Sequence, residues 1–324
     1  MRWPIERIAF KMAVLGGALS LWPLWSSAQK EERRFASSEL SEAQILEAIA
    51  NAHVDNLRPV GTTSIVFQLQ LTGAIDAAFK PESRLHPRGW AHEIAAYRVA
   101  RLLGMDQVPP ARVRSLERTQ MRRHLAPEWH GNWEALVGQI IFSSPRPGVF
   151  YTKGASIYWV PNLERSELDQ PEARKNWSAW LKPGHPLDER ERILARDLAT
   201  MCLFDALIGN ADRMSGGNLR TATNRGIRRV IIRDHDLAFP AHWSEPQRKR
   251  ILGELRLAER FPRDLVEALR KADEAALRSA TEDPEVGPLL TPEEFAALLD
   301  RRAMVLSYVA ALIEMHGEEA VLDL

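Results

Sequence analysis

The sequence lacks cysteine pairs, a net charge and basic tracts, and each absence excludes a class of protein. Cys202 is the only cysteine among the 324 residues, so neither an intramolecular disulfide nor a thiolate metal cluster can hold the fold together. The 43 basic and 43 acidic residues cancel, which leaves no overall field to attract nucleic acid or anionic lipid. No strong basic run carries interleaved aromatic residues. We therefore expect no nucleic-acid partner.

What the chain does contain is typical of a soluble globular protein. Apolar residues make up 45% of the sequence and charged residues 27%, close to the averages for such proteins. The length predicts one large domain or two smaller ones. We find no internal repeat and no low-complexity tract, and the histidines show no spacing typical of zinc ligands.

Residues 1–28 have the order of a secretory signal. Arg2, Arg7 and Lys11 precede the apolar run Met12–Trp25, and small residues follow it at 26–28. The run has the length of a signal-peptide core and is shorter than a typical spanning helix. We expect a cleaved signal peptide, and the alternative is an uncleaved N-terminal anchor. Only such an anchor would bring the protein into contact with a membrane. The chain is then exported, either to a periplasm or to the outside of the cell.

The first half of the remaining chain predicts a small sheet with one helix. Residues 29–50 are expected to form a linker that leads into a helix. Apolar and polar residues alternate over 65–71 and 75–80, which predicts a hairpin of two strands. A helix is expected from about 91 to 104 by its apolar spacing. Further strands are expected at 108–114, 135–142 and 154–161.

The second half predicts helices around one hairpin. A helix that is apolar nearly all round ends near Ile208, as a buried helix does. Asn224, Arg225 and Gly226 form a turn signal between two short strands. A capping box opens a long amphipathic helix over 291–317. The fold class is therefore α+β, with a sheet-plus-helix lobe at 51–160 and a larger, mainly helical lobe at 161–324.

Five residues occur in an order that suits phosphoryl transfer. This reaction needs a cation on the phosphates, a carboxylate near the attacking hydroxyl and oxygen ligands for a metal ion. Lys80 ends a strand and Glu93 begins the next helix. Asp212 follows the buried helix in a polar loop, and Asn218 and Asp234 flank the hairpin. Protein kinases have the same order of parts.

Three motifs also resemble a known family. They are "AAFKP…EIAAYRVARLLGMDQVPP", "LIGNADR…GN" and "IIRDHDLAF". In this order they are similar to the secretory-pathway kinases of the Golgi casein kinase and four-jointed type and their bacterial relatives, which are linked more distantly to HipA and phosphoinositide kinases. The resemblance covers roughly residues 55–320. It implies a two-lobed protein-kinase-like fold, ATP as phosphate donor, and Mg²⁺ or Mn²⁺.

The resemblance assigns a role to each motif residue. Lys80 is then the ATP-binding lysine, and Glu93 either pairs with it or assists the metal. Asp212 is the catalytic aspartate and Asp234 the metal-binding one. Asn218 is the expected loop ligand of the metal, although the family places this ligand five residues after the aspartate and Gly217 stands there.

Other departures from the family concern the nucleotide loop and the histidine or other ring-bearing residue that often follows the catalytic aspartate. Gly61, Thr62 and Thr63 are the expected ATP-binding loop, although no G-x-G-x-x-G pattern is present. Met214 stands where many members have a ring. The animal members are rich in disulfides, which this chain cannot form, so a bacterial relative is the better match.

Each assignment has a simpler alternative. Lys80 could be a solvated strand-end lysine, and Glu93 a first-turn glutamate favoured by the helix dipole. Asp236 competes with Asp234 for the metal. His235 could donate to a metal ligand or occupy a turn, and the sequence favours the turn. Cys202, on an apolar helix face, is expected to be inert core.

The leading hypothesis from the sequence is an ATP-dependent kinase of atypical type. Its acceptor is a hydroxyl, either of a serine or threonine in a protein or of a sugar or other small alcohol. A pseudokinase that serves as a nucleotide- or partner-binding scaffold is the alternative, motivated by the altered nucleotide loop. A metal-dependent phosphohydrolase is a third hypothesis, which the scarcity of clustered His and Asp disfavours.

Overall fold

The computed structural model describes residues 33–36, 38–61, 63–73, 75–214 and 217–324. The expected signal peptide at 1–28 and Thr62 of the expected nucleotide loop therefore lie outside the described residues. Arg33–Leu324 forms one compact unit. Among the described residues, none of the helices has both the length and the apolar character that crossing a membrane requires.

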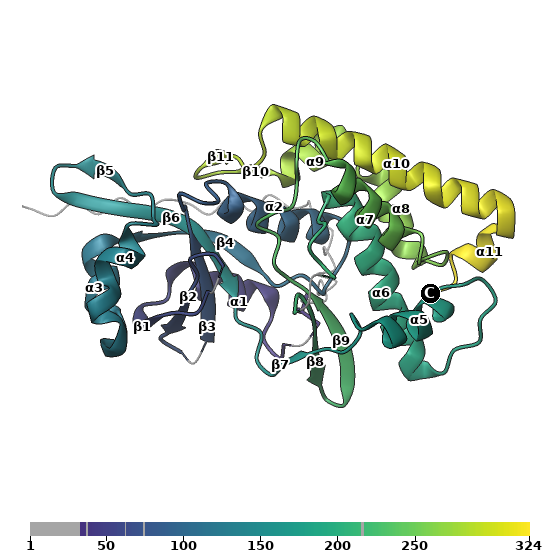
Figure 1. Cartoon of the computed structure of the whole chain (residues 1–324), viewed down its shortest axis with the longest axis horizontal. Coiled ribbons are helices and arrows are strands. Elements are labelled where there is room, and N and C mark those ends of the chain that lie inside the picture. Colours follow the sequence, from purple (N-terminus) through teal and green to yellow (C-terminus); the bar gives the residue numbers. More distant parts are fainter. Residues whose placement is uncertain (1–32, 37, 62, 74, 215–216) are drawn as a thin grey trace, which may run out of the picture. The chain divides into compact units, whose positions relative to one another are not determined.

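A six-stranded antiparallel sheet dominates the first half of this unit (Figure 1). Its main path runs in the order β1-β2-β3-β6-β4, every neighbouring pair is antiparallel, and β5 pairs with the outer part of β6. The strands are β1 (Val54–Pro59), β2 (Phe67–Leu71), β3 (Ile75–Pro81), β4 (Ala111–Glu117), β5 (Ser143–Arg146) and β6 (Val149–Tyr158). The predicted hairpin of 65–71 and 75–80 corresponds to β2 and β3, and Lys80 lies opposite Ala155 of β6.

The strand β1 was missed by the sequence analysis because it is an edge strand. It carries polar residues and ends in Pro59, and both features are tolerated at a sheet edge but not within a sheet. The connection from β1 to β2 turns back tightly at Gly61. A Cβ on Gly61 would lie 1.9 Å from the carbonyl oxygen of Ser64, so only glycine fits there.

The helix α1 (Glu42–Asn51) occupies part of the segment predicted as a linker. Ser41 caps it in a capping box with Gln44, and Ile45 and Ile49 are fully buried against the sheet. The prediction of a linker over 29–50 is therefore wrong for residues 42–50. A spacing of four residues between two buried isoleucines is the signal that the charged composition of the segment obscured.

The predicted strand at 135–142 is also wrong. Residues Trp133–Val137 form the short helix α4, which ends at Gly138, and β5 begins only at Ser143. Trp133, Leu136 and Val137 are buried, a helical spacing that a short apolar run does not distinguish from a buried strand. The helices before it are α2 (Gly89–Leu102), α3 (Arg118–His124) and the 3-10 helix η1 (Pro127–Asn132).

The second half is mainly helical (Figure 1). Its helices are α5 (Pro171–Trp180), α6 (Glu189–Ile208), α7 (Glu245–Leu255), α8 (Arg263–Lys271), α9 (Glu274–Ala280), α10 (Pro292–His316) and α11 (Glu318–Val321). A three-stranded antiparallel sheet, in the order β7 (Leu163–Arg165), β8 (Leu219–Asn224) and β9 (Ile227–Ile232), contains the predicted hairpin. The strands β10 (Glu282–Asp283) and β11 (Gly287–Pro288) form a separate small pair.

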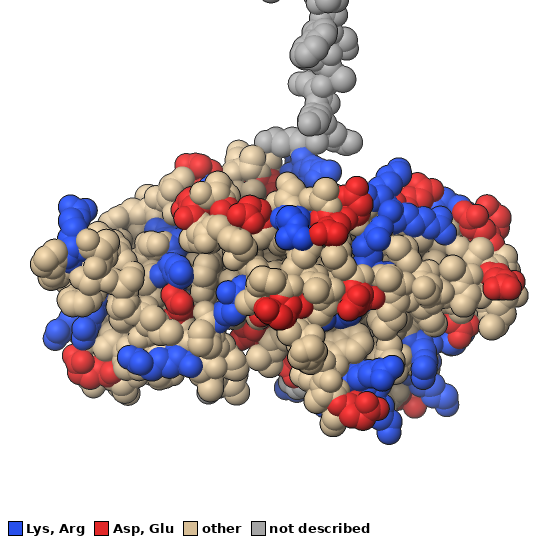
Figure 2. All heavy atoms as spheres, turned by 90° about the horizontal axis from the view of Figure 1, so that it is seen from above, with Lys and Arg blue, Asp and Glu red and all other residues tan. Residues whose placement is uncertain are grey.

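Two hydrophobic clusters form the interior of the described unit. One holds α1 against the six-stranded sheet and includes Phe67 and Phe79. The other joins α2 to the helices of the second half and includes Phe204 of α6. Cys202 lies in this second cluster, and burial raises the pKa of its thiol, so it is inert core as expected. On the face shown in Figure 2, basic and acidic side chains are interspersed.

Candidate functional site

Lys80 lies at the centre of the candidate site. Its strand β3 directs the ammonium toward α2 and toward the loop that follows β9. The Nζ atom is 2.5 Å from Oε1 of Glu93, 2.5 Å from Oδ1 of Asp234 and 3.7 Å from Oδ2 of Asp236. Lys80, Glu93 and Asp234, which the sequence places on a strand, on a helix and in a loop, are thus brought together, and Asp236 joins them.

The charges in this cluster set one another's protonation. Burial by itself lowers the pKa of the Lys80 ammonium, but Glu93, Asp234 and Asp236 together raise this pKa well above its usual value. Burial raises the pKa of Glu93, but Lys80 and His235 reverse this and hold the pKa far below its usual range. Lys80 likewise lowers the pKa of Asp234. The ion pairs are therefore fully charged at neutral pH.

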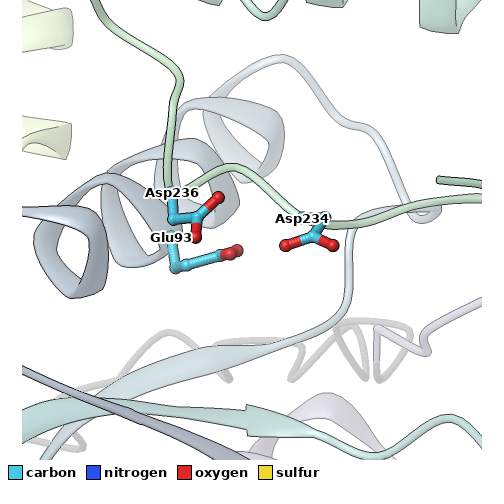
Figure 3. Close-up of side chains that lie close together, drawn as sticks. All are labelled: Glu93, Asp234 and Asp236. Carbon is cyan, nitrogen blue, oxygen red and sulfur yellow. The ribbon is translucent and has the colours of Figure 1, made fainter. Parts of the chain in front are cut away.

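The carboxylates of Glu93, Asp234 and Asp236 converge on one point (Figure 3). One oxygen of each lies within 4.8 Å of the others. Carboxylate oxygens are the ligands that Mg²⁺ and Mn²⁺ prefer. With all three ionised, the carboxylates carry more negative charge than the Lys80 ammonium balances, and a divalent cation would offset the excess. The donor set therefore fits the predicted metal, although burial raises the pKa of Asp236.

His235 holds Glu93 in place. Its backbone N–H donates to Oε1 of Glu93 at 2.9 Å, and its Nδ1 lies 3.3 Å from Oε2. The ring is buried and packs edge-on against Phe204. The sequence analysis favoured a turn residue at this position, and that choice is wrong. In the structure His235 instead contacts a carboxylate of the site, that of Glu93. Asp234 just before it has φ of 69°, a strained conformation of the kind often found at functional sites.

Asp212 lies in the loop that follows α6. This helix ends at Gly209, which has φ of 74°, and a Cβ there would lie 2.9 Å from Cδ of Pro240. The side chain of Asn210 then accepts from the backbone N–H of Asp212 at 3.1 Å and donates to the carbonyl of Asp234 at 3.2 Å. Asn210 thus joins the loop of Asp212 to the loop of Asp234, which follows β9.

Asn218 is placed against Asp212. Its Nδ2 donates to Oδ2 of Asp212 at 2.8 Å and to the backbone carbonyl of Asp212 at 3.1 Å. The sequence analysis expected Asn218 as a metal ligand, and that role stays a prediction. The family places this ligand one residue earlier, where Gly217 stands. Despite this shift, Asn218 contacts the carboxylate of Asp212 and fixes its position.

Arg213, next to Asp212, is a buried residue that supports this loop. It is fully buried and pairs with Asp205 of α6 through two hydrogen bonds, of 2.9 and 3.0 Å. It also donates to the carbonyl of Arg233, next to Asp234. Asp205 is the one charged residue in the segment 198–208 of this helix, and a charged residue in such an apolar segment requires a buried partner. That signal was available in the sequence.

The helix α10 supports the loop of Asp234 and Asp236. The ring of His92, next to Glu93, lies between the carbonyl of Asp236 (3.2 Å from Nδ1) and Oε1 of Glu294 (3.1 Å from Nε2). Seven residues further along α10, Arg301 donates to the carbonyls of Leu207 and Pro240. Side chains seven apart share one helix face. This face therefore holds both ends of the segment 236–240.

The helix α7 packs behind the loop of Asp212 and carries a buried glutamate. Arg250 donates to the carbonyl of Ala211 at 3.0 Å, while Glu254 is 5% exposed. Burial, followed by the nearby carboxylate of Asp205, raises the pKa of Glu254 to about 7. Glu254 is therefore a pH-sensitive residue close to the Asp205–Arg213 ion pair.

We expect Glu254→Gln to change how stability depends on pH. Because the folded state holds this proton more tightly than the unfolded state, the free energy of unfolding falls as pH rises from about 4.5 to 7. At pH 8 the variant should be more stable by up to about 3 kcal/mol, and the difference should vanish near pH 4.5. Denaturant unfolding at both pH values measures this, with the exposed Glu245→Gln of the same helix as control. A variant less stable than the natural protein at pH 8 contradicts the assignment.

The comparisons with known proteins connect this arrangement to kinases by fold. A scan against models of protein families gives no match, and a search of curated proteins gives none. Among solved structures, the crystal structure of the Golgi casein kinase matches with a TM-score of 0.64 and 18% identity, covering 88% of this chain and 80% of that one. At this identity the match shows the fold alone.

Two further structures agree. The Golgi casein kinase with Mn and ADP bound matches with a TM-score of 0.63 and 18% identity, covering 87% of this chain and 78% of that one. The structure of hydra Fam20 with sugar matches with a TM-score of 0.61 and 20% identity, covering 88% of this chain and 92% of that one. The chain thus has a two-lobed, protein-kinase-like α+β fold, as the sequence predicts.

Proposed function

We propose that this protein is an atypical kinase that transfers the γ-phosphoryl group of ATP to a hydroxyl acceptor. The observation that carries the proposal is the position of Lys80, whose ammonium contacts Glu93 and Asp234 at once. These residues come from a strand, a helix and a loop far apart in the sequence. The kinase-like fold supports the same conclusion, because it places a lysine, a glutamate and a metal-binding aspartate in this order.

The proposed roles follow from the contacts. Lys80, held by Glu93, contributes positive charge to the phosphate oxygens, which carry the negative charge of the reaction. Asp212 accepts the proton of the acceptor hydroxyl or orients it for attack. Asn218 fixes the Asp212 carboxylate through its Nδ2 at 2.8 Å, and Asn210 keeps that loop at the carbonyl of Asp234.

The carboxylates of Asp234, Asp236 and Glu93 would hold Mg²⁺ or Mn²⁺. When bound, the metal neutralises phosphate charge and orients the phosphate chain. Asn218 remains a further proposed ligand. Gly61 and Thr63 of the turn between β1 and β2, with Thr62, are the proposed loop over the nucleotide.

The proposal also covers the acceptor substrate and the cellular location of the protein. The acceptor is a serine or threonine of a protein, or a sugar or small alcohol. Export beyond the cytoplasm rests on the order of residues 1–28, with an uncleaved anchor as the alternative. Kinship with the bacterial, HipA and phosphoinositide kinases rests on the motifs alone. The Lys80–Glu93 pair argues against a phosphohydrolase, and the ionised carboxylate cluster gives a pseudokinase no support.

Purified protein with ATP and Mn²⁺ or Mg²⁺ tests the proposal. We expect the nucleotide and metal together to raise the unfolding temperature, because a ligand that binds only the folded state stabilises it. We also expect transfer of labelled γ-phosphate to a protein or sugar acceptor. Stabilisation without transfer to either acceptor class favours the pseudokinase, and the absence of both effects contradicts nucleotide binding altogether.

A further inference from the structure

Three arginines gather at one end of the β7–β8–β9 sheet, beside the candidate site. Arg165 of β7 lies directly opposite Arg220 of β8 in the antiparallel register. Directly opposite residues of two strands project from the same face, and like charges in such a pair are destabilising. Arg233, which follows β9, completes the group, with its Nη2 3.9 Å from Oδ2 of Asp234.

The charge of this arginine cluster (Arg165, Arg220 and Arg233) is poorly balanced. Within the part of the chain that the structure describes, Arg165 and Arg220 form no ion pair, and the Nε of Arg233 is buried without a hydrogen-bond partner. The carboxylate of Asp234 is already 2.5 Å from Lys80. Burial, and then the charges of Arg233 and Arg165, lower the pKa of Arg220, and the nearby carboxylate of Asp169 offsets this only in part.

The sheet face that carries the cluster points toward the six-stranded sheet. Ile231 lies opposite Arg220 in the register, and it packs in the same hydrophobic cluster as Phe67 and Phe79. Arg220 also donates to the carbonyl of Gly217 at 2.7 Å, one residue before Asn218. The cluster therefore borders the loop that holds Asn218 and the loop that holds Asp234.

We propose that Arg165, Arg220 and Arg233 form an anion subsite that binds a phosphate group next to the metal cluster. Guanidinium groups bind phosphate oxygens through two parallel hydrogen bonds, and converging arginines favour a doubly charged anion. The phosphate belongs either to the nucleotide or to a separate ligand, such as a phosphorylated acceptor. The inference rests on the proposed function only in treating the neighbouring carboxylates as the transfer site.

A series at Arg165 tests the subsite, because this side chain is exposed and makes no hydrogen bond among the described residues. The probe is inorganic phosphate without metal, titrated calorimetrically into the full chain. We expect Arg165→Lys to retain binding, Arg165→Gln to weaken it about tenfold, as for the loss of one charged hydrogen bond, and Arg165→Glu to weaken it further. Arg228→Glu, at an exposed position of β9 in the same sheet, is the matched control and should bind as the natural protein does.

A second titration, with Mn²⁺ and ATP, distinguishes the two sources of the phosphate. If ATP affinity falls in the same order across the series while adenosine affinity is unchanged, the anion is a phosphate of the nucleotide. If ATP affinity is unchanged, the subsite binds a separate ligand. The same phosphate affinity in all Arg165 variants, or no phosphate binding to the natural protein, overturns the subsite. Neither titration requires phosphate transfer, so a protein without kinase activity still tests it.

The stability of the ligand-free protein gives an independent readout. If the arginines repel one another, Arg165→Gln and Arg165→Glu should raise the unfolding temperature of the free protein by about 1–2 °C, since such cross-strand pairs contribute a few tenths of a kcal/mol. The same substitutions should reduce the stabilisation that phosphate provides. A lower unfolding temperature for both variants contradicts the unbalanced charge on which the subsite depends.

Discussion

Replacing Asp212 by asparagine is expected to lower kcat for phosphate transfer by about 10²–10⁴-fold, the usual contribution of a general base. The substitution keeps the size of the side chain and one oxygen for the bond from Asn218, so the loop should stay in place. Binding of Mn²⁺ and ATP should change little, because the three carboxylates that converge near Lys80 are those of Glu93, Asp234 and Asp236. Steady-state kinetics with calorimetric binding measures both quantities.

The matched control is Asp300→Asn, an exposed aspartate of α10. It should leave both kcat and nucleotide affinity at the values of the natural protein. Asp212→Asn with undiminished kcat would remove the catalytic role from Asp212. A large loss of nucleotide binding in the same variant would instead indicate that Asp212 holds the metal.

Replacing Lys80 by methionine is expected to destabilise the protein and to make its stability depend on metal. Without the ammonium, the carboxylates of Glu93, Asp234 and Asp236 repel one another in a largely buried cluster. Removing one partner of a buried ion pair costs about 3–5 kcal/mol, and we expect about 2–4 kcal/mol because Asp234 is 29% exposed. Mn²⁺ alone should stabilise this variant more than the natural protein, since the ion no longer competes with Lys80.

Thermal unfolding with Mn²⁺, and with Mn²⁺ plus ATP, measures this effect. ATP should add little stabilisation to the Lys80 variant, because the ammonium that we propose contacts the phosphates of ATP is absent. Lys153→Met on the neighbouring strand β6, where the lysine is 43% exposed, should behave as the natural protein. Equal stabilisation of both variants by Mn²⁺ would show that the carboxylates near Lys80 are not the metal site.

The sequence predicted the residues that come together around Lys80 better than it predicted the residues that hold them in place. Lys80, Glu93 and Asp234 could be found because each belongs to a local pattern, namely a strand end, a helix start and a strand-to-loop junction. The roles of His235 and Arg213 were not predicted, because a histidine or an arginine in a polar loop gives the same sequence pattern whether it is solvated or buried. Their roles depend on Glu93 and Asp205, which are distant in sequence.

The fold shows the same division. The alternation of apolar and polar residues predicted β2 and β3, and the capping box predicted the start of α10 at Pro292. The strand β1 and the helix α4 were missed or misassigned, since an edge strand needs little apolar character and a short apolar run fits either a strand or a helix. The support that α10 gives through Glu294 and Arg301 is a tertiary contact with no local signal.

A crystal structure with Mn²⁺ and a non-hydrolysable ATP analogue tests the central claim most directly. The account predicts that the metal is bound by Asp234 together with Glu93 or Asp236, that Lys80 contacts the phosphates, and that Asp212 faces the γ-phosphate. An analogue whose phosphates lie away from Lys80, or a metal bound outside these three carboxylates, would contradict the assignment of a phosphoryl-transfer site.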